Sequence, residues 1–187
     1  QSRPTGSLPG WVMKRHETER KDIIPYQIDS QIFEGKVLNT KTVIENSIAS
    51  IEVMLDNEVV LTVPVGDLRY AAAMDFLQGL TTHQEHWYME MEHITGSIEG
   101  NQVWVRANGE IFRSGVSLSE LFGYDETFGF QVMAGEPFFF FRKGDEYGLN
   151  YSDEEVMLGF DEIAHHYCCG FSIYNPMHYD SMISFYA

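Results

Sequence analysis

A β-hairpin pattern over residues 48–63 constrains the fold more than any other feature of this 187-residue chain. Apolar residues recur at every second position, which is the period of a β-strand with one buried face: they are Ile51, Val53 and Leu55. Asp56 and Asn57 then tolerate the left-handed backbone that a tight hairpin turn requires. Residues 58–63 have the pattern of the returning strand. The apolar side of this two-stranded ribbon is expected to pack on the next element of the chain.

A helix is predicted directly after the hairpin, over about residues 68–79. Pro64 and Gly66 end the strand, and the Asp67 carboxylate can accept amide hydrogens at a helix N-terminus. Apolar side chains then follow at steps of four residues: they are Leu68, Ala72, Phe76 and Leu80. We expect the helix to lie on the hairpin and to bury Phe76 and Leu77.

A second hairpin is predicted from residues 94–98 and 102–106, which flank a Gly100-Asn101 turn. Residues 107–117 have a loop-like composition. Ser117 fits a capping box that opens a very short helix, which ends at Gly123.

The aromatic-rich C-terminal third is predicted to contain a third hairpin and a second main helix. Residues 137–141 form a continuous apolar run, typical of a strand covered on both faces, and residues 147–151 return from it. Residues 152–155 resemble another capping box. A helical stripe follows, made of Val156, Phe160, Ile163 and Tyr167.

The predicted fold class is therefore α+β, with antiparallel β-hairpins packed against two main helices. Residues 1–24 are expected to be a mobile arm, because they are polar, mixed in charge and rich in Pro and Gly near the start. Residues 25–123 would form a hairpin-helix-hairpin domain. Residues 124–187 would form the C-terminal part, either as a separate unit or as one continuous domain with the preceding residues.

The charge of the chain is strongly acidic and unevenly distributed. The formal net charge is −16, although seven of the twelve basic residues and only five acids precede residue 44. That part carries +2, so the remaining 144 residues carry −18. Such a surface repels phosphate backbones and anionic membranes, which argues against nucleic-acid binding. It favours either simple solubility or a protein partner with a basic surface.

The two cysteines, Cys168 and Cys169, are adjacent, and neighbouring cysteines rarely form a disulfide with each other. They are the candidate catalytic thiols, although the predicted helix C-terminus and the acidic chain disfavour a thiolate. Small core residues are the competing interpretation. Reduced thiols, the absence of an apolar run long enough to span a membrane and the absence of an intact signal peptide at the start favour a cytoplasmic location.

The histidines are the candidate metal ligands. His83 and His86 lie near three glutamates, and His165 and His166 lie beside the cysteine pair. Imidazole, thiolate and carboxylate groups can bind zinc or iron, but the spacing matches no familiar zinc pattern. Helix capping and solvent exposure are the competing interpretation for His83 and His86. No cofactor is predicted from the residues themselves.

The order of these pieces resembles the formate dehydrogenase accessory sulfurtransferase family. The resemblance covers roughly residues 43–123, with VMLDNEVVLTVPVGDLRYAAAMDFLQGL at 53–80, NQVWVRA at 101–107 and FRSGVSLSELF at 112–122. It is carried by Pro64, Asp67, Leu68, Phe76 and Leu77, and more faintly by Glu154, Glu155 and Val156.

The resemblance implies an accessory role in passing sulfur to the molybdenum cofactor of formate dehydrogenase. Members of the family use cysteines in a loop that corresponds to residues 113–117, where this chain has no cysteine. Persulfide chemistry needs a thiol. The prediction is therefore a divergent accessory or binding protein without sulfurtransferase activity, rather than an enzyme. The alternatives are an acidic interaction domain that binds a basic protein and a small metalloenzyme that uses the histidines.

Overall fold

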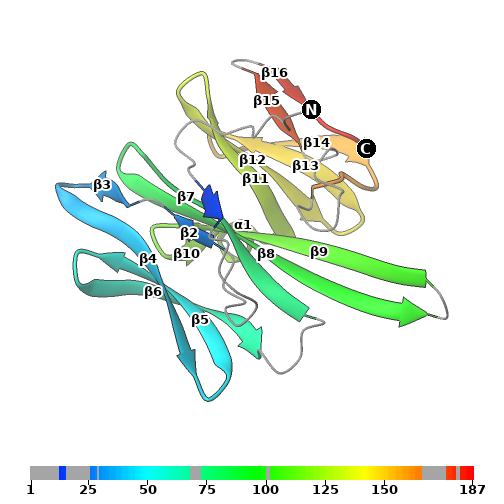
Figure 1. Cartoon of the computed structure of the whole chain (residues 1–187). Helices are drawn as coiled ribbons and strands as arrows, with labels where there is room; N and C mark the ends of the chain where they lie inside the picture. The colour runs from blue at the N-terminus through cyan, green and yellow to red at the C-terminus, as the bar shows by residue number, and fades with distance from the viewer. Residues whose placement is uncertain are drawn as a thin grey trace, which may run out of the picture.

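The computed structural model describes residues 13–15, 26–28, 30–67, 73–99, 102–165, 176–179 and 182–187. Three antiparallel sheets of four strands make up most of this part of the chain (Figure 1). The first sheet has the order β3 (Gln31–Phe33), β4 (Lys36–Glu45), β5 (Ile48–Leu55), β6 (Glu58–Asp67). The middle sheet has the order β10 (Val116–Ser117), β9 (Gln102–Arg113), β8 (His86–Glu99), β7 (Ala73–His83).

The third sheet has the order β11 (Glu126–Met133), β12 (Glu136–Lys143), β13 (Glu146–Tyr151), β14 (Glu154–Phe160). Two small ribbons complete the strands: β1 (Met13–Arg15) pairs with β2 (Tyr26–Ile28), and β15 (Met177–Tyr179) pairs with β16 (Met182–Ser184). The described part of the chain contains a single helix, α1 (Leu118–Phe122), between the middle and third sheets in sequence.

Tight turns explain why each of the three sheets is built from consecutive strands. Both turn residues have positive φ at five reversals, as a two-residue hairpin with the natural strand twist requires. These pairs are Glu34-Gly35, Asn46-Ser47, Ser114-Gly115, Ala134-Gly135 and Ser152-Asp153. Each strand therefore folds back on the one before it.

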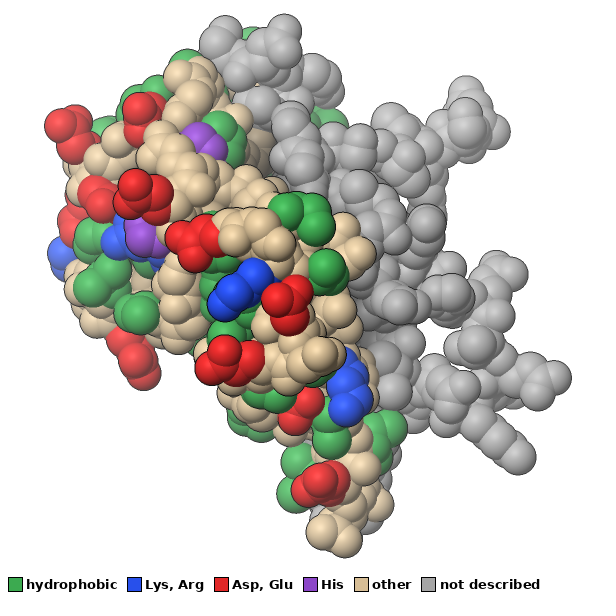
Figure 2. All heavy atoms as spheres, turned by 90° about the vertical axis from the view of Figure 1, so that its left-hand side faces the viewer, with side chains coloured by type: hydrophobic (Ala, Val, Ile, Leu, Met, Phe, Trp, Pro, Cys, Tyr) green, Lys and Arg blue, Asp and Glu red, His purple; other side chains and the backbone are tan. Residues whose placement is uncertain are grey.

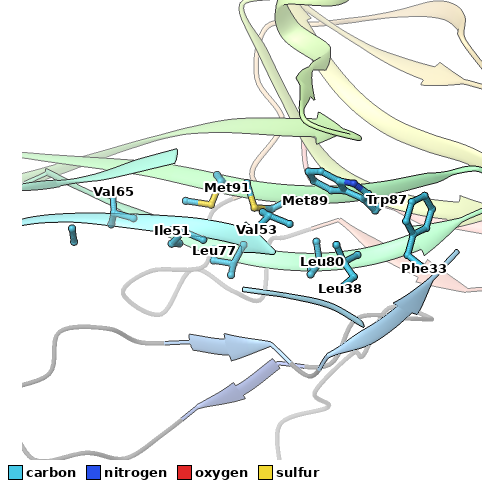
Figure 3. Close-up of a cluster of buried hydrophobic side chains, with 11 residues drawn as sticks. Phe33, Leu38, Ile51, Val53, Val65, Leu77, Leu80, Trp87, Met89 and Met91 are labelled. Carbon is cyan, nitrogen blue, oxygen red and sulfur yellow. The ribbon is translucent and has the colours of Figure 1, made fainter. Parts of the chain in front are cut away.

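The middle sheet is covered on both faces. Successive side chains of β8 point to opposite sides, as in any strand. Trp87, Met89 and Met91 pack against the apolar face of the first sheet (Figure 3). Tyr88 packs instead with Ile111 of β9 against aromatic side chains of the third sheet.

The Phe-rich strand β12 divides its side chains between two cores. Phe139 and Phe141 join the core shared with the middle sheet, whereas Phe138 and Phe140 face the C-terminal residues. Phe185 contacts the Phe140 ring, with 5.2 Å between the ring centroids. All four phenylalanines from 138 to 141 are buried, which confirms the prediction of a strand covered on both faces.

The middle and third sheets come into close backbone contact at Gly109 of β9. A Cβ atom at this position would lie 2.5 Å from the Thr127 carbonyl oxygen of β11, so a side chain would force the backbones apart. The hydroxyl of Thr127 also accepts a 2.8 Å hydrogen bond from the Ile111 amide. Gly109 therefore allows the two sheets to share backbone contacts.

Several local predictions are confirmed. Strands β5 and β6 pair as expected, with Leu55 opposite Glu58 and Asp56 at a φ of 54°. The hairpin of β8 and β9 brings Ile98 opposite Val103, although its turn, residues 100–101, lies outside the described residues. The Ser117 hydroxyl caps α1 by accepting from the Glu120 amide, and Gly123 ends the helix in the left-handed conformation.

The predicted α+β class is wrong, because neither main helix is present in the described residues. Residues 73–79 of the first predicted helix belong to β7, and residues 68–72 lie outside the described part. Leu77 is buried as expected, but it is on a strand. Residues 156–160 of the second predicted helix belong to β14, and the segment predicted as a loop over 107–117 continues β9 and forms β10.

The cause of the error lies in the spacing of the apolar residues. Steps of four residues place side chains on one face of a helix, but four is also a multiple of two, so the same residues share one face of a strand. Ser152 and Asp153, interpreted as part of a helix cap, instead form the β13–β14 turn. Ser and Asp favour both structures because their side chains bond to nearby backbone groups.

Candidate functional site

The structure places only some of the predicted site residues. Cys168, Cys169 and His166 lie outside the described part of the chain. His83 and His86 face each other across the β7–β8 turn, and His86 Nδ1 lies 3.1 Å from the Ser114 hydroxyl. No group of three metal-binding side chains occurs among the described residues.

His165 is different, because it is buried among carboxylates between the middle and third sheets. Its Nε2 lies 3.0 Å from Glu126 Oε1, and its Nδ1 lies 3.8 Å from Glu92 Oε1. The imidazole also stacks on Phe128, with 3.7 Å between ring centroids. We call the group of Glu90, Glu92, Glu126, Arg142 and His165 the buried polar cluster.

Glu126 is the centre of this cluster. Its Oε1 accepts a 2.9 Å hydrogen bond from the Gly109 amide, and its Oε2 lies 3.3 Å from Arg142 Nε. Burial by itself would raise the pKa of the Glu126 carboxyl, but the hydrogen bond and charge of His165, together with Gly109 and Arg142, lower it below its usual value. The ionised carboxylate is therefore the form that the fold stabilises.

Glu90 lies on the face of β8 that also carries Glu92, and its carboxylate is held by backbone amides. Gly129 and Phe130 of β11 donate hydrogen bonds of 2.8 and 2.9 Å to its two carboxylate oxygens. Burial nevertheless raises the pKa of Glu90, because desolvation outweighs these two bonds and the nearby His165. Glu92 accepts a 2.8 Å hydrogen bond from Gln78 of β7.

The buried polar cluster joins four separate parts of the chain. Glu90 and Glu92 come from β8, Glu126 from the start of β11, Arg142 from β12, and His165 from the segment after β14. The described contacts engage these groups with one another and with backbone amides. Their chemistry is therefore that of an internal clamp, which fixes the C-terminal segment against two sheets.

Sequence reasoning treated His165 as a candidate metal ligand and missed its carboxylate partners. Apolar and polar residues alternate from Met89 to Glu92, a pattern that usually indicates a strand with one solvent-exposed face. In the structure Glu90 and Glu92 are buried, because the third sheet covers that face. The signal that could have indicated buried acids was the alternation of these two glutamates with methionines in a chain rich in aromatic residues.

A second feature lies on the surface, at the hairpins of the third sheet. Between residues 143 and 162 seven exposed acids accompany one exposed basic residue, Lys143. We call these acids the acidic edge: they are Asp145, Glu146, Asp153, Glu154, Glu155, Asp161 and Glu162. Lys143 bonds to Glu155 at 3.3 Å, and Arg113 bonds to Asp153 at 3.0 Å, so among the described residues two of the seven carboxylates are in ion pairs.

Exposed apolar side chains lie among these acids on β14. Val156, Met157 and Phe160 keep 48%, 43% and 40% of their surface accessible. On the face drawn in Figure 2, carboxylates are interspersed with apolar, basic and neutral side chains.

Comparison with protein-family models, with curated proteins and with solved structures finds no match for this chain. Among the described residues, no helix is long and apolar enough to cross a membrane.

Proposed function

We propose that the protein is an acidic binding module that recognises a basic protein surface. The observation that supports this proposal is the acidic edge, where seven exposed carboxylates flank three exposed apolar side chains of β14 along the chain. Binding surfaces combine an apolar centre with a polar rim that sets specificity. A rim of one charge attracts a partner of the opposite charge and rejects partners of the same charge.

Some acids of the acidic edge are left without an ion-pair partner in the part of the chain that the structure describes. Within the described residues, Glu154, Asp161 and Glu162 form no ion pair. Self-repulsion in such a cluster is relieved when a cationic surface binds. An accessory role related to the sulfurtransferases remains a prediction that depends on the resemblance alone.

The test is titration of the full chain with an oligolysine peptide at low and at physiological ionic strength. The edge variant combines Glu154→Gln, Asp161→Asn and Glu162→Gln. The matched control combines Glu34→Gln, Glu45→Gln and Glu58→Gln, three exposed acids of the first sheet. Both variants change the net charge by the same amount.

We expect the edge variant to bind oligolysine about tenfold more weakly, and the control to bind nearly as well as the wild type. Binding should also weaken steeply with salt, because the charges are exposed. Equal weakening of the two variants would mean that only net charge matters and would overturn the proposal.

A further inference from the structure

Strand β14 is an edge of the third sheet in the described structure. The strand order is β11-β12-β13-β14, so β14 pairs on one side only, with β13. Six of its seven residues are exposed, and Leu158 is half-buried. An unpaired edge presents amide and carbonyl groups that can pair with another extended segment.

The side chains of β14 leave apolar surface uncovered on both faces of the sheet. Val156 lies opposite Leu149, and Met157 lies opposite Gly148 in the neighbouring register position. Because successive residues of a strand point to opposite faces, Val156 and Met157 are exposed on different sides. A further strand beside β14 would cover both side chains.

The other sheet edges are shorter, protected or covered. Strand β6 carries Pro64, which lacks an amide hydrogen. Strands β3 and β10 contain only three and two residues. Strand β11 lies against β9, where the Ile111 amide bonds to Thr127. Strand β7, the remaining edge of the middle sheet, accepts a hydrogen bond at its Leu80 carbonyl oxygen from the Gln31 side chain of β3. Within the described part of the chain, residues 154–157 of β14 are all exposed and pair with β13 alone.

We propose that β14 accepts a basic, extended segment of a partner protein as a fifth strand of the third sheet. This inference rests on the proposed function and gives its mode of binding. Addition of a strand to a sheet edge obtains affinity from main-chain hydrogen bonds and specificity from alternate side chains.

The negative charge along β14 determines which kind of added strand can pair with it. A second copy of this chain paired at residues 154–157 would bring Glu154 and Glu155 close to the same carboxylates of the other copy, and like charges on paired strands disfavour the pairing. Lysine or arginine side chains on the added strand would instead lie beside Asp153, Glu154 and Glu155. A partner of opposite charge is therefore favoured over self-association.

An irregularity limits the length of the pairing. The register between β13 and β14 shifts between Tyr147 and Gly148, and Gly159 has a φ of 71°. Bulges of this kind bend an edge away from further pairing. The added strand should therefore pair with residues 154–157, where the register is regular.

The test uses two peptides with the same side chains, both made of alternating lysine and valine. In the second peptide alternate backbone amides are N-methylated, which removes donors without changing charge. We expect the unmodified peptide to bind the wild-type chain about tenfold more tightly than the methylated peptide. Its binding should also slow hydrogen exchange at the amides of residues 154–157.

A matched pair of variants locates the site. Met157→Lys places a like charge against the incoming lysines and should weaken binding of the unmodified peptide about tenfold. Ile44→Lys changes an apolar residue of β4 that is 48% exposed, away from the edge, and should leave binding unchanged.

The possible failures are distinguishable. Equal binding of the two peptides, or equal loss in the two variants, would overturn strand addition at β14 while the acidic module stands. No binding of either lysine peptide or of oligolysine would overturn both proposals. Dimerisation of the free chain that Met157→Lys abolishes would identify a second copy as the occupant and would also overturn the inference.

Discussion

At the residue scale, the carboxylate of Glu126 fastens the C-terminal segment to the sheets. It is almost fully buried and bonds to His165, Gly109 and Arg142, which come from three different parts of the chain. A buried carboxylate of this kind is stabilising only while its partners are present, because desolvation is costly. Removal of its charge should therefore lower the free energy of unfolding by more than the loss of one hydrogen bond would.

We predict that Glu126→Gln lowers the free energy of unfolding at neutral pH by about 2–4 kcal/mol. The pKa of Glu126 is lower in the folded chain than in the unfolded chain, so the unfolded chain takes up the proton first as the pH falls. The stabilisation is complete above the unfolded pKa and is lost as the pH falls from about 5 through the folded pKa.

Urea titrations of the wild type and the variant between neutral and acid pH would measure this pH-dependent loss of stability. The difference between their unfolding free energies should shrink as the pH falls, because the wild type then loses the same charge. Glu120→Gln, at an exposed position of α1, serves as the control and should follow the wild type. A difference that stays constant with pH would show that the charge of Glu126 does not stabilise the fold.

At the element scale, the two-residue turns are what convert apolar segments into consecutive strands. The β11–β12 turn places Ala134 at a φ of 51° before Gly135 at 86°. Alanine is strained in this left-handed region, whereas asparagine adopts it more readily. Ala134, which is exposed, therefore makes this turn less stable than a better-suited residue would.

We predict that Ala134→Asn raises the free energy of unfolding by about 0.5–1 kcal/mol, because Asn-Gly is the preferred pair for this turn. Ala134→Val should lower it by a similar or larger amount, since a β-branched side chain is poorly tolerated at positive φ. Chemical denaturation of the three proteins provides the comparison. The reverse order of stability would contradict the left-handed turn.

At the scale of the whole molecule, the middle sheet couples the first sheet to the third. Met89 faces the first sheet and Tyr88, its neighbour on β8, faces the third. Each sheet alone would expose an apolar face to water, so stacking the three is what gives the chain continuous cores.

We predict that Met89→Ala destabilises all three sheets together, by about 2–5 kcal/mol. Native-state hydrogen exchange should show equal loss of protection at β5 and at β12, although β12 does not contact the first sheet's core. Phe33→Leu, a milder change in the same core, should give a smaller loss with the same equal distribution. Loss of protection confined to β3–β6 would mean that the first sheet unfolds independently.

The sequence by itself determined the local structure wherever a turn residue or a cap has one meaning. The hairpin at Asp56, the helix capped by Ser117 and the doubly buried strand 137–141 were all predictable, because their signals are contained within a few neighbouring residues. Segments 73–80 and 156–160 were ambiguous, since their apolar spacing fits one face of a helix and one face of a strand.

Only the tertiary structure decided these segments and the surroundings of the candidate residues. Ladder partners on β8 and β13 supply the hydrogen bonds that make β7 and β14 strands. In the same way, Glu90 and Glu92 became interior residues because a distant sheet covers them. Which face of a strand meets water depends on what packs against it, and that partner lies far away along the chain.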